Sequence, residues 1–189
     1  MADRIKLVDS TLRDGSHAVR HSFTEEQVER IVEKLDTCGV ELIELSHGDG
    51  LGGSSYNYGF SKVDTFDLLE AASKHVRNAK LTVLLLPGIG TIADLKRAQE
   101  CGASVVRVAT HVTEADVSAE HIHAAKDLGM MAVGFLMMAH MAPVERIAEE
   151  AKKMESYGAD YINLADSAGY LMPDDVKERI GAVLDAVEI

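Results

Sequence analysis

The stretch Cys101-Gly-Ala-Ser-Val-Val-Arg-Val108 joins the end of an amphipathic helical pattern to a short apolar strand pattern through a single glycine. Glycine suits the position just past a helix because it adopts a left-handed conformation without a steric penalty. The same junction recurs at 38–45, 128–135 and 157–164. With the apolar runs at 5–8 and 80–86, these junctions predict six strands that alternate with helices. Their nearly continuous apolar character is typical of parallel strands buried on both faces.

Helical patterns fill the intervals between these strands. Thr24-Glu-Glu-Gln27 has the form of a capping box, and an apolar stripe follows it at positions 28, 31, 32 and 35. Thr91 is placed to cap a later helix, and Pro173 suits the first turn of the last one. Further helices are expected over 66–76, over 118–128 and after Pro143. The alternation predicts an α/β fold.

Polar residues interrupt the apolar pattern where the predicted strands end. They are Arg13, Asp14, Ser46, His47, Thr110, His111, His140, Asp166 and Ser167. In β/α barrels functional side chains gather at the C-terminal ends of several strands, whereas an open doubly wound sheet binds mainly at one switch point. We therefore expect an incomplete TIM (β/α)8-type barrel with six βα units. It would form one partial domain over residues 1–189, lacking the last two strands and the C-terminal region.

Composition narrows the possible partners. The chain has 19 Lys and Arg against 31 Asp and Glu, a formal charge of −12, which should repel nucleic acid and anionic membranes. No apolar run approaches the roughly 18 residues of a membrane span, and the first residues have no signal core. Cys38 and Cys101 form neither a CxxC pair nor a disulfide framework, so we expect both to be buried and reduced in a cytoplasmic protein.

The stretch Asp9-Ser-Thr-Leu-Arg-Asp-Gly-Ser-His-Ala18 holds the strongest candidates for chemistry. Arg13, Asp14 and His17 could bind an anionic oxygen, hold a metal and move a proton. The plainer alternative is a polar turn in which the Asp and Arg pair with each other. A second candidate is the glycine-rich loop 46–59, which could cradle a phosphate, act as a mobile lid or be an ordinary surface loop.

The first of these stretches resembles the opening of 4-hydroxy-2-oxovalerate aldolases, in the metal-dependent lyase and aldolase superfamily that includes HMG-CoA lyase. The resemblance extends over the whole chain. Matching stretches are 47–50, 53–59, 84–90, 105–111, 113–116, 134–138 and 154–158. It implies a TIM barrel in which a divalent metal, manganese in the family, assists the cleavage of 4-hydroxy-2-oxo acids to pyruvate and an aldehyde such as acetaldehyde.

The resemblance also implies roles for individual residues. His17 would be the catalytic base, Arg13 would bind substrate and stabilise the enolate, Asp14 would be a metal ligand and Ser167 would bind substrate. It further implies an acylating acetaldehyde dehydrogenase as partner and a place in aromatic hydrocarbon catabolism. The family's remaining metal ligands, a His-x-His pair on the seventh strand, have no match in this chain.

Two alternatives stay open. One is a related lyase or synthase that acts on a CoA thioester, and the other is a non-catalytic fragment or split half of such a barrel. In either case an incomplete barrel would leave sheet edges at 5–8 and 161–164 open, so we expect self-association.

Overall fold

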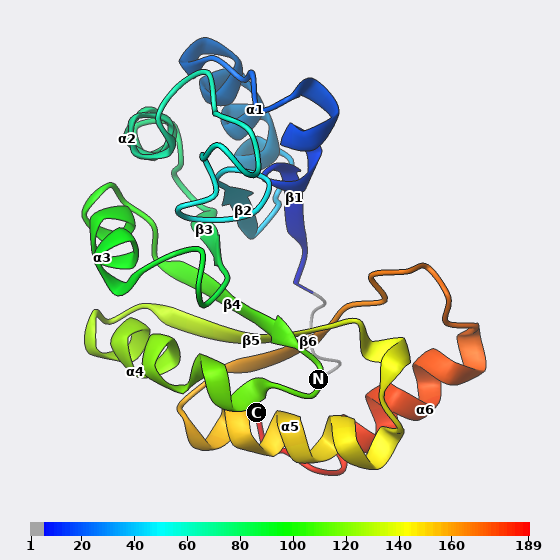
Figure 1. The fold of residues 1–189 in the computed structure, drawn as a ribbon. Coiled ribbons are helices and arrows are strands. Elements are labelled where there is room, and N and C mark those ends of the chain that lie inside the picture. Colours follow the sequence, from blue (N-terminus) through cyan, green and yellow to red (C-terminus); the bar gives the residue numbers. More distant parts are fainter. Residues whose placement is uncertain (1–5) are drawn as a thin grey trace. The chain divides into compact units, whose positions relative to one another are not determined.

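The computed structural model describes residues 6–189, in which strands and helices alternate (Figure 1). The strands are β1 (Val8–Leu12), β2 (Leu42–Leu45), β3 (Lys80–Leu85), β4 (Val105–His111), β5 (Met131–Met137) and β6 (Tyr161–Leu164). The α-helices are α1 (Glu25–Thr37), α2 (Thr65–Ser73), α3 (Ile92–Glu100), α4 (Ala119–Asp127), α5 (Val144–Ser156) and α6 (Pro173–Leu184). Short 3₁₀ helices are η1 (Asp14–Val19), η2 (Ala115–Ser118) and η3 (Ala139–Met141).

The strands are hydrogen-bonded in sequential order from β1 to β6. The β1–β2, β2–β3 and β5–β6 pairs are parallel, and a helix covers the return from each strand to the next. Sequential parallel strands with intervening helices have the topology of a TIM-type barrel, here with six of the eight βα units. The predicted α/β fold, an incomplete TIM-type barrel, is therefore confirmed.

The chain divides into two compact units, the first ending at Val106 and the second running from Arg107 to Ile189. In the first unit, α1 and α2 pack together beside β1–β3. Thr24 and Thr91 each accept a backbone N–H in a capping box, as the sequence predicts. The interior is aliphatic, and fully buried side chains include Ile43, Leu45, Leu69, Leu85 and Leu95.

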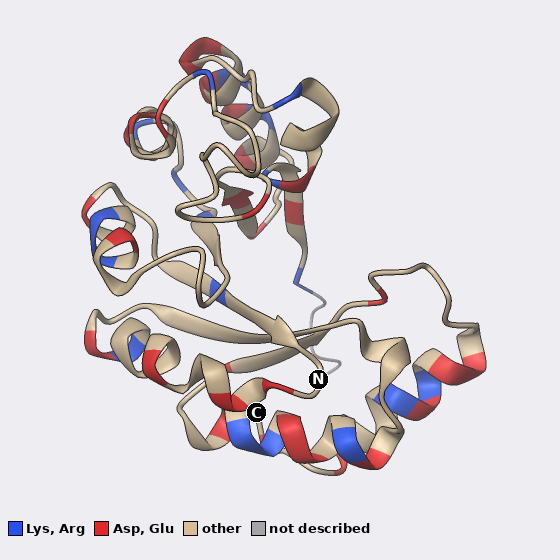
Figure 2. Ribbon diagram, viewed as in Figure 1, with Lys and Arg blue, Asp and Glu red and all other residues tan. Residues whose placement is uncertain are grey.

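The second unit packs α5 against β5, β6 and α6. Its interior contains Leu136, Ile147 and Met154, and the absence of a side chain at Gly134 lets Met154 approach the β5 backbone. Fully buried Glu150 accepts hydrogen bonds from the Lys153 ammonium at 2.7 Å and the Ala115 N–H at 2.9 Å, so its charge is compensated. Figure 2 shows acidic and basic residues interspersed along α5 and α6.

Two local predictions were wrong. The first strand was placed at 5–8, but it runs from Val8 to Leu12; Ile5 lies outside the described residues. The core anchor of this strand is Leu12, which pairs with Leu45 and is 2% exposed, whereas Val8 is 42% exposed. The predicted run and the observed strand therefore share only Val8, and the buried end of the strand lies further along the chain. Cys38 is exposed rather than buried, because it caps the C-terminus of α1, while Cys101 is buried.

The four junction glycines all have positive φ, from 72° at Gly129 to 104° at Gly102, which confirms their helix-ending role. Among residues 6–189, no helix is long and apolar enough to cross a membrane.

Candidate active site

The end of β1 places a guanidinium between three oxygen atoms. Arg13 donates from Nε to the Glu44 carboxylate at 2.7 Å, and from Nη1 to Asp14 at 2.8 Å and the Gly48 carbonyl at 3.4 Å. Glu44 is fully buried on β2, so Arg13 compensates a carboxylate that would be costly to leave alone. Asp14 has a 65% exposed side chain. The Asp–Arg pair of the plainer alternative is therefore present, within a larger arrangement that fixes the guanidinium.

His17 lies on η1, the 3₁₀ helix that directly follows this strand, and is exposed. The edge of its ring that bears Nε2 lies against Gly48, where a Cβ atom would overlap the ring. A 3₁₀ helix was not foreseen here, and it is what turns His17 toward the loop after β2. Arg13, Asp14 and His17 are thus gathered at one end of β1 in the first unit.

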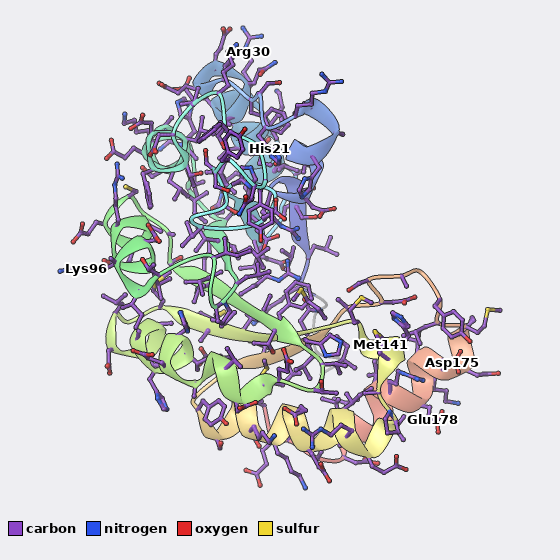
Figure 3. The ribbon with its side chains drawn as sticks, viewed as in Figure 1. His21, Arg30, Lys96, Met141, Asp175 and Glu178 are labelled. Atoms are coloured by element: carbon purple, nitrogen blue, oxygen red, sulfur yellow. The ribbon has the colours of Figure 1, made fainter. Side chains whose placement is uncertain are left out.

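His21 is held close to His17 by an unusual backbone. Arg20 and His21 have φ values of 51° and 54°, a left-handed conformation that is uncommon for residues other than glycine. It is secured by hydrogen bonds from the Lys62 N–H to the His21 carbonyl at 2.9 Å and from the His21 N–H to the Ser16 carbonyl at 2.8 Å. Figure 3 shows His21 among neighbouring side chains, whereas Arg30 points away from the unit.

The hydrogen bonds of Ser16 determine the tautomer of His21. The Ser16 hydroxyl has one proton, which it donates to the Arg13 carbonyl at 2.6 Å. Its 2.9 Å contact with His21 Nδ1 must then be a bond that Nδ1–H donates to the hydroxyl oxygen. In the neutral ring, the unprotonated nitrogen is therefore Nε2. Burial lowers the pKa of His21, the nearby His17 lowers it further, and Asp49 opposes both; the net downward direction favours the neutral ring.

His47 and Asp49 complete the group from the loop after β2. The His47 ring stacks on that of His21 with centroids 3.7 Å apart, and its Nδ1 accepts the Asp49 backbone N–H at 3.1 Å. Burial, followed by the neighbouring His21, lowers the pKa of His47. Ligand atoms of His17, His21 and Asp49 all lie within 4.8 Å of one another.

The glycines of the 46–59 loop are explained by close packing. A Cβ at Gly53 would overlap the His47 ring, and one at Gly50 would lie 2.7 Å from the Leu84 carbonyl oxygen. A Cβ at Gly52 would approach the Ile89 carbonyl oxygen to 2.5 Å. The Leu51 N–H also donates to the Leu84 carbonyl at 2.8 Å. These contacts favour a loop packed on the end of β3 over a mobile lid or a phosphate cradle.

Ser167 belongs to the second unit, in the loop that follows β6. Its hydroxyl oxygen accepts the Met138 N–H at 3.0 Å, so its own proton can be donated elsewhere. The preceding Asp166 shapes this loop by accepting the N–H groups of Tyr170 at 3.0 Å and Leu171 at 2.9 Å. The pKa of Asp166 lies below its usual value, mainly because its carboxylate accepts the hydrogen bond from the Leu171 N–H.

Sequence reasoning missed three residues of the first-unit group. Glu44 is a carboxylate in the middle of an apolar strand, which signals a buried partner for a cation. His21 follows His17 by four residues, a spacing that is informative only when the backbone between them is known. Asp49 was seen only as part of a glycine-rich loop.

Comparison with known proteins places this chain in a family. The HMGL-like family model matches residues 4–189. The 4-hydroxy-2-oxovalerate aldolase of Moorella thermoacetica is 64% identical over 188 residues, which cover 100% of this chain and 56% of that protein. The aldolase of the same name from Carboxydothermus hydrogenoformans is 58% identical over 189 residues, again with 100% and 56% covered. The chain thus spans about half the length of these curated relatives.

Solved structures agree on the fold. The carboxyl transferase domain of Rhizobium etli pyruvate carboxylase superposes with a TM-score of 0.81 at 18% identity, covering 98% of this chain and 34% of that chain. At this identity the likeness concerns the fold alone. The family match and the close relatives go further, and together they show that the chain belongs to the HMGL-like family.

Proposed function

We propose that this chain supplies the N-terminal part of a 4-hydroxy-2-oxovalerate aldolase, which cleaves 4-hydroxy-2-oxo acids to pyruvate and an aldehyde, acetaldehyde for the five-carbon substrate. The observation that carries the proposal is the grouping of Arg13, Asp14 and His17 at the end of β1, in a chain 64% identical to a protein of that name. Active sites of TIM-type barrels lie at this end of the strands.

The chemistry needs a base and a fixed positive charge. The His17 imidazole takes the proton of the 4-hydroxyl group, the C3–C4 bond breaks, and the electron pair moves into the enolate of pyruvate. Arg13, oriented by Glu44 and Asp14, stabilises the negative charge on the enolate oxygen. Protonation of the enolate carbon then gives pyruvate. Ser167 would donate its hydroxyl proton to a substrate oxygen.

A divalent metal, Mn²⁺ in this proposal, would polarise the keto oxygen of the substrate when bound. Asp14 fits as one ligand because its carboxylate is well exposed at the strand end. Within residues 6–189, however, Asp14 is not part of any group of three potential ligands. The other ligands would therefore come from the portion of the complete enzyme that this chain does not span.

The proposal predicts that this chain alone binds Mn²⁺ weakly and releases little pyruvate. A fusion protein would join this chain to the segment of the Moorella thermoacetica relative that the chain does not span. This fusion should restore pyruvate release from 4-hydroxy-2-oxovalerate. Calorimetry with Mn²⁺ and a coupled pyruvate assay measure both effects, with circular dichroism to verify folding. Tight Mn²⁺ binding and full turnover by the chain alone would contradict the prediction. A folded fusion that cleaves a CoA thioester but releases no pyruvate would overturn the aldolase proposal.

Other parts of the proposal concern setting and partners. We propose that the complete aldolase has an acylating acetaldehyde dehydrogenase as its partner, because acetaldehyde is a reactive product that a neighbouring enzyme can consume. A role in aromatic hydrocarbon catabolism belongs to the same proposal. A cytoplasmic location is supported by the two free cysteines, which suit a reducing compartment.

For this chain by itself we also expect self-association. Apolar residues lie exposed on both edge strands, with Val8 at 42% and Tyr161 at 40%, and Ile180 on α6 is 46% exposed. Exposed strand edges and apolar patches favour pairing between copies. Light scattering over a concentration series should show a mass that rises above that of one chain. A constant monomer mass without binding of an apolar dye would refute this expectation.

A further inference from the structure

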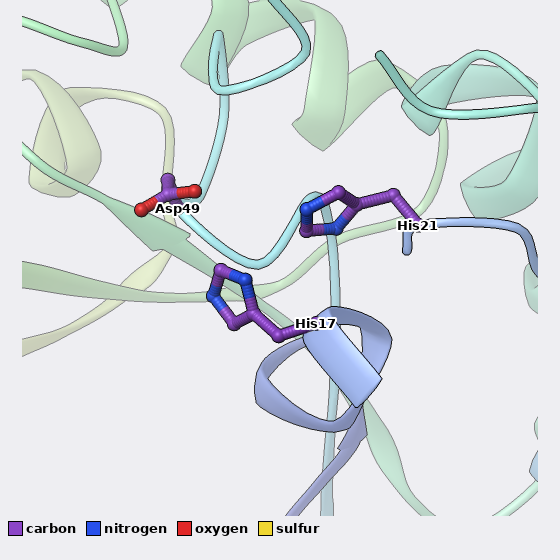
Figure 4. A group of neighbouring side chains, drawn as sticks. All are labelled: His17, His21 and Asp49. Carbon is purple, nitrogen blue, oxygen red and sulfur yellow. The ribbon is translucent and has the colours of Figure 1, made fainter. Parts of the chain in front are cut away.

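We propose that His17, His21 and Asp49 form a binding site for a transition-metal ion that prefers imidazole ligands, with Zn²⁺ as the best fit. This site differs from the carboxylate position at Asp14. Figure 4 shows the two rings and the carboxylate grouped between η1 and the loop after β2. A second consequence rests on the proposed function: an ion bound here occupies His17, so it inhibits proton transfer by that residue.

The spacing of the three side chains suits a single ion after a small closure. Their ligand atoms lie within 4.8 Å of one another, whereas ligands about 2.0–2.1 Å from a tetrahedral zinc ion are roughly 3.4 Å apart. His17 is exposed and Asp49 is half-buried, so both side chains can rotate inward. His21 is the fixed member, because its backbone is secured on both sides.

The hydrogen bonds around His21 prepare it as a ligand. Its Nδ1–H is bound by the Ser16 hydroxyl at 2.9 Å, so the lone pair is on Nε2. Metal-binding histidines usually donate their other N–H to a protein oxygen in this way, which fixes both tautomer and ring orientation. The stacked His47 ring supports His21 from one side. The same His47 also anchors Asp49 by accepting its backbone N–H at 3.1 Å.

The ligand set discriminates between ions. Two imidazoles and one carboxylate, with a fourth position open to water, are a zinc-type combination that also suits Co²⁺ and Ni²⁺. Mn²⁺ and Mg²⁺ favour oxygen ligands and gain less from two ring nitrogens. The site should therefore bind Zn²⁺ in the presence of a large excess of Mg²⁺.

Titration of this chain with Zn²⁺ against a chromophoric chelator tests the proposal without any activity assay. We expect one ion per chain, and visible absorption bands of tetrahedral Co²⁺ when cobalt replaces zinc. Because even the loss of a residue that supports a ligand typically weakens metal affinity about 10–100-fold, His21→Ala and Asp49→Asn should each weaken binding by at least tenfold. Thermal unfolding of each variant verifies that it is folded. If His21→Ala does not fold, the Asp49→Asn variant alone tests the site.

Two control variants make the assignment specific. His123→Ala removes an exposed histidine of α4 outside the group, and Asp14→Asn removes the ligand of the proposed catalytic metal. Zn²⁺ affinity should stay within a few-fold of wild type in both. Equal losses in His123→Ala and His21→Ala, or no Zn²⁺ binding at micromolar to millimolar concentration, would overturn the site. A loss in Asp14→Asn alone would place the ion at the catalytic position instead.

The inhibitory consequence has its own readout. In the Moorella fusion with Mn²⁺ present, Zn²⁺ should lower the rate of pyruvate release, and Asp49→Asn should shift the inhibition curve to at least tenfold higher Zn²⁺. If Zn²⁺ binds as predicted but the fusion has no aldolase activity, the metal site stands and the proposed function fails. Unchanged inhibition in Asp49→Asn would overturn the inhibitory role.

Discussion

Replacement of His17 by alanine is expected to lower kcat of the complete aldolase by about 10²–10⁴-fold, the usual contribution of a general base. Mn²⁺ affinity should change far less, because His17 is not placed as a ligand of that ion. The measurements are kcat from pyruvate release by the fusion protein and Mn²⁺ affinity from calorimetry. Asp14→Ala is the contrasting variant, since the loss of a metal ligand should reduce both quantities. If His17→Ala kept kcat within a few-fold of wild type, His17 would not be the base.

A second variant separates the position of His17 from its chemistry. Gly48 does not have a positive φ, so alanine is compatible with its backbone, but the new Cβ would displace the His17 ring. Gly48→Ala should therefore lower kcat although the His17 and Asp14 side chains keep their chemistry, because misplacement of a reacting group by about 1 Å can reduce a rate 10²-fold. An unchanged kcat would show that the ring position seen here is not the working one.

The arrangement of elements could be predicted because its causes are local. Apolar runs, capping residues such as Thr24 and junction glycines such as Gly102 act within a few residues of where they stand. The start of β1 could not be predicted in this way. Val8 and Leu12 are both apolar and both pair with β2, and only packing in the folded chain buries Leu12 and leaves Val8 exposed.

The candidate site was predictable only in part for a similar reason. Arg13, Asp14 and His17 are adjacent in sequence, so their proximity needs little more than a turn. The approach of His21 depends on a left-handed backbone that the distant Lys62 N–H helps to hold. Asp49 reaches the group because Gly48 and Gly53 leave room for two histidine rings. Such contacts between remote segments leave little trace in a single sequence.

Asp36 is a buried residue outside the site whose replacement should lower the stability of the fold strongly. It lies at the end of α1 with 5% exposure, and its Oδ1 accepts the N–H groups of Asn78 at 2.8 Å, Ala79 at 2.7 Å and Arg77 at 3.3 Å. Its Oδ2 accepts the Asn78 side-chain amide at 3.1 Å. One carboxylate thus secures the segment that leads into β3.

Burial by itself raises the pKa of Asp36, but these backbone hydrogen bonds outweigh it and hold the pKa below its usual value. A carboxyl group with a depressed pKa in the folded state stabilises the protein above its unfolded-state pKa, near 4. That contribution is present at pH 7 and is lost as the pH falls below 4 through the lower pKa of the folded state.

Asp36→Ala should reduce the free energy of unfolding by about 3–5 kcal/mol at pH 7, because it leaves several partly buried N–H groups without an acceptor and each such group costs about 1–3 kcal/mol. Urea unfolding followed by circular dichroism measures the loss. Asp127→Ala, at an exposed position at the end of α4, should change stability by no more than about 0.5 kcal/mol. Between pH 5 and pH 3, the wild type should lose more stability than Asp36→Ala, because only the wild type has this carboxylate to protonate. Parallel pH profiles for the two proteins, or a loss at pH 7 as small as that of Asp127→Ala, would show that Asp36 does not hold this segment through its charge.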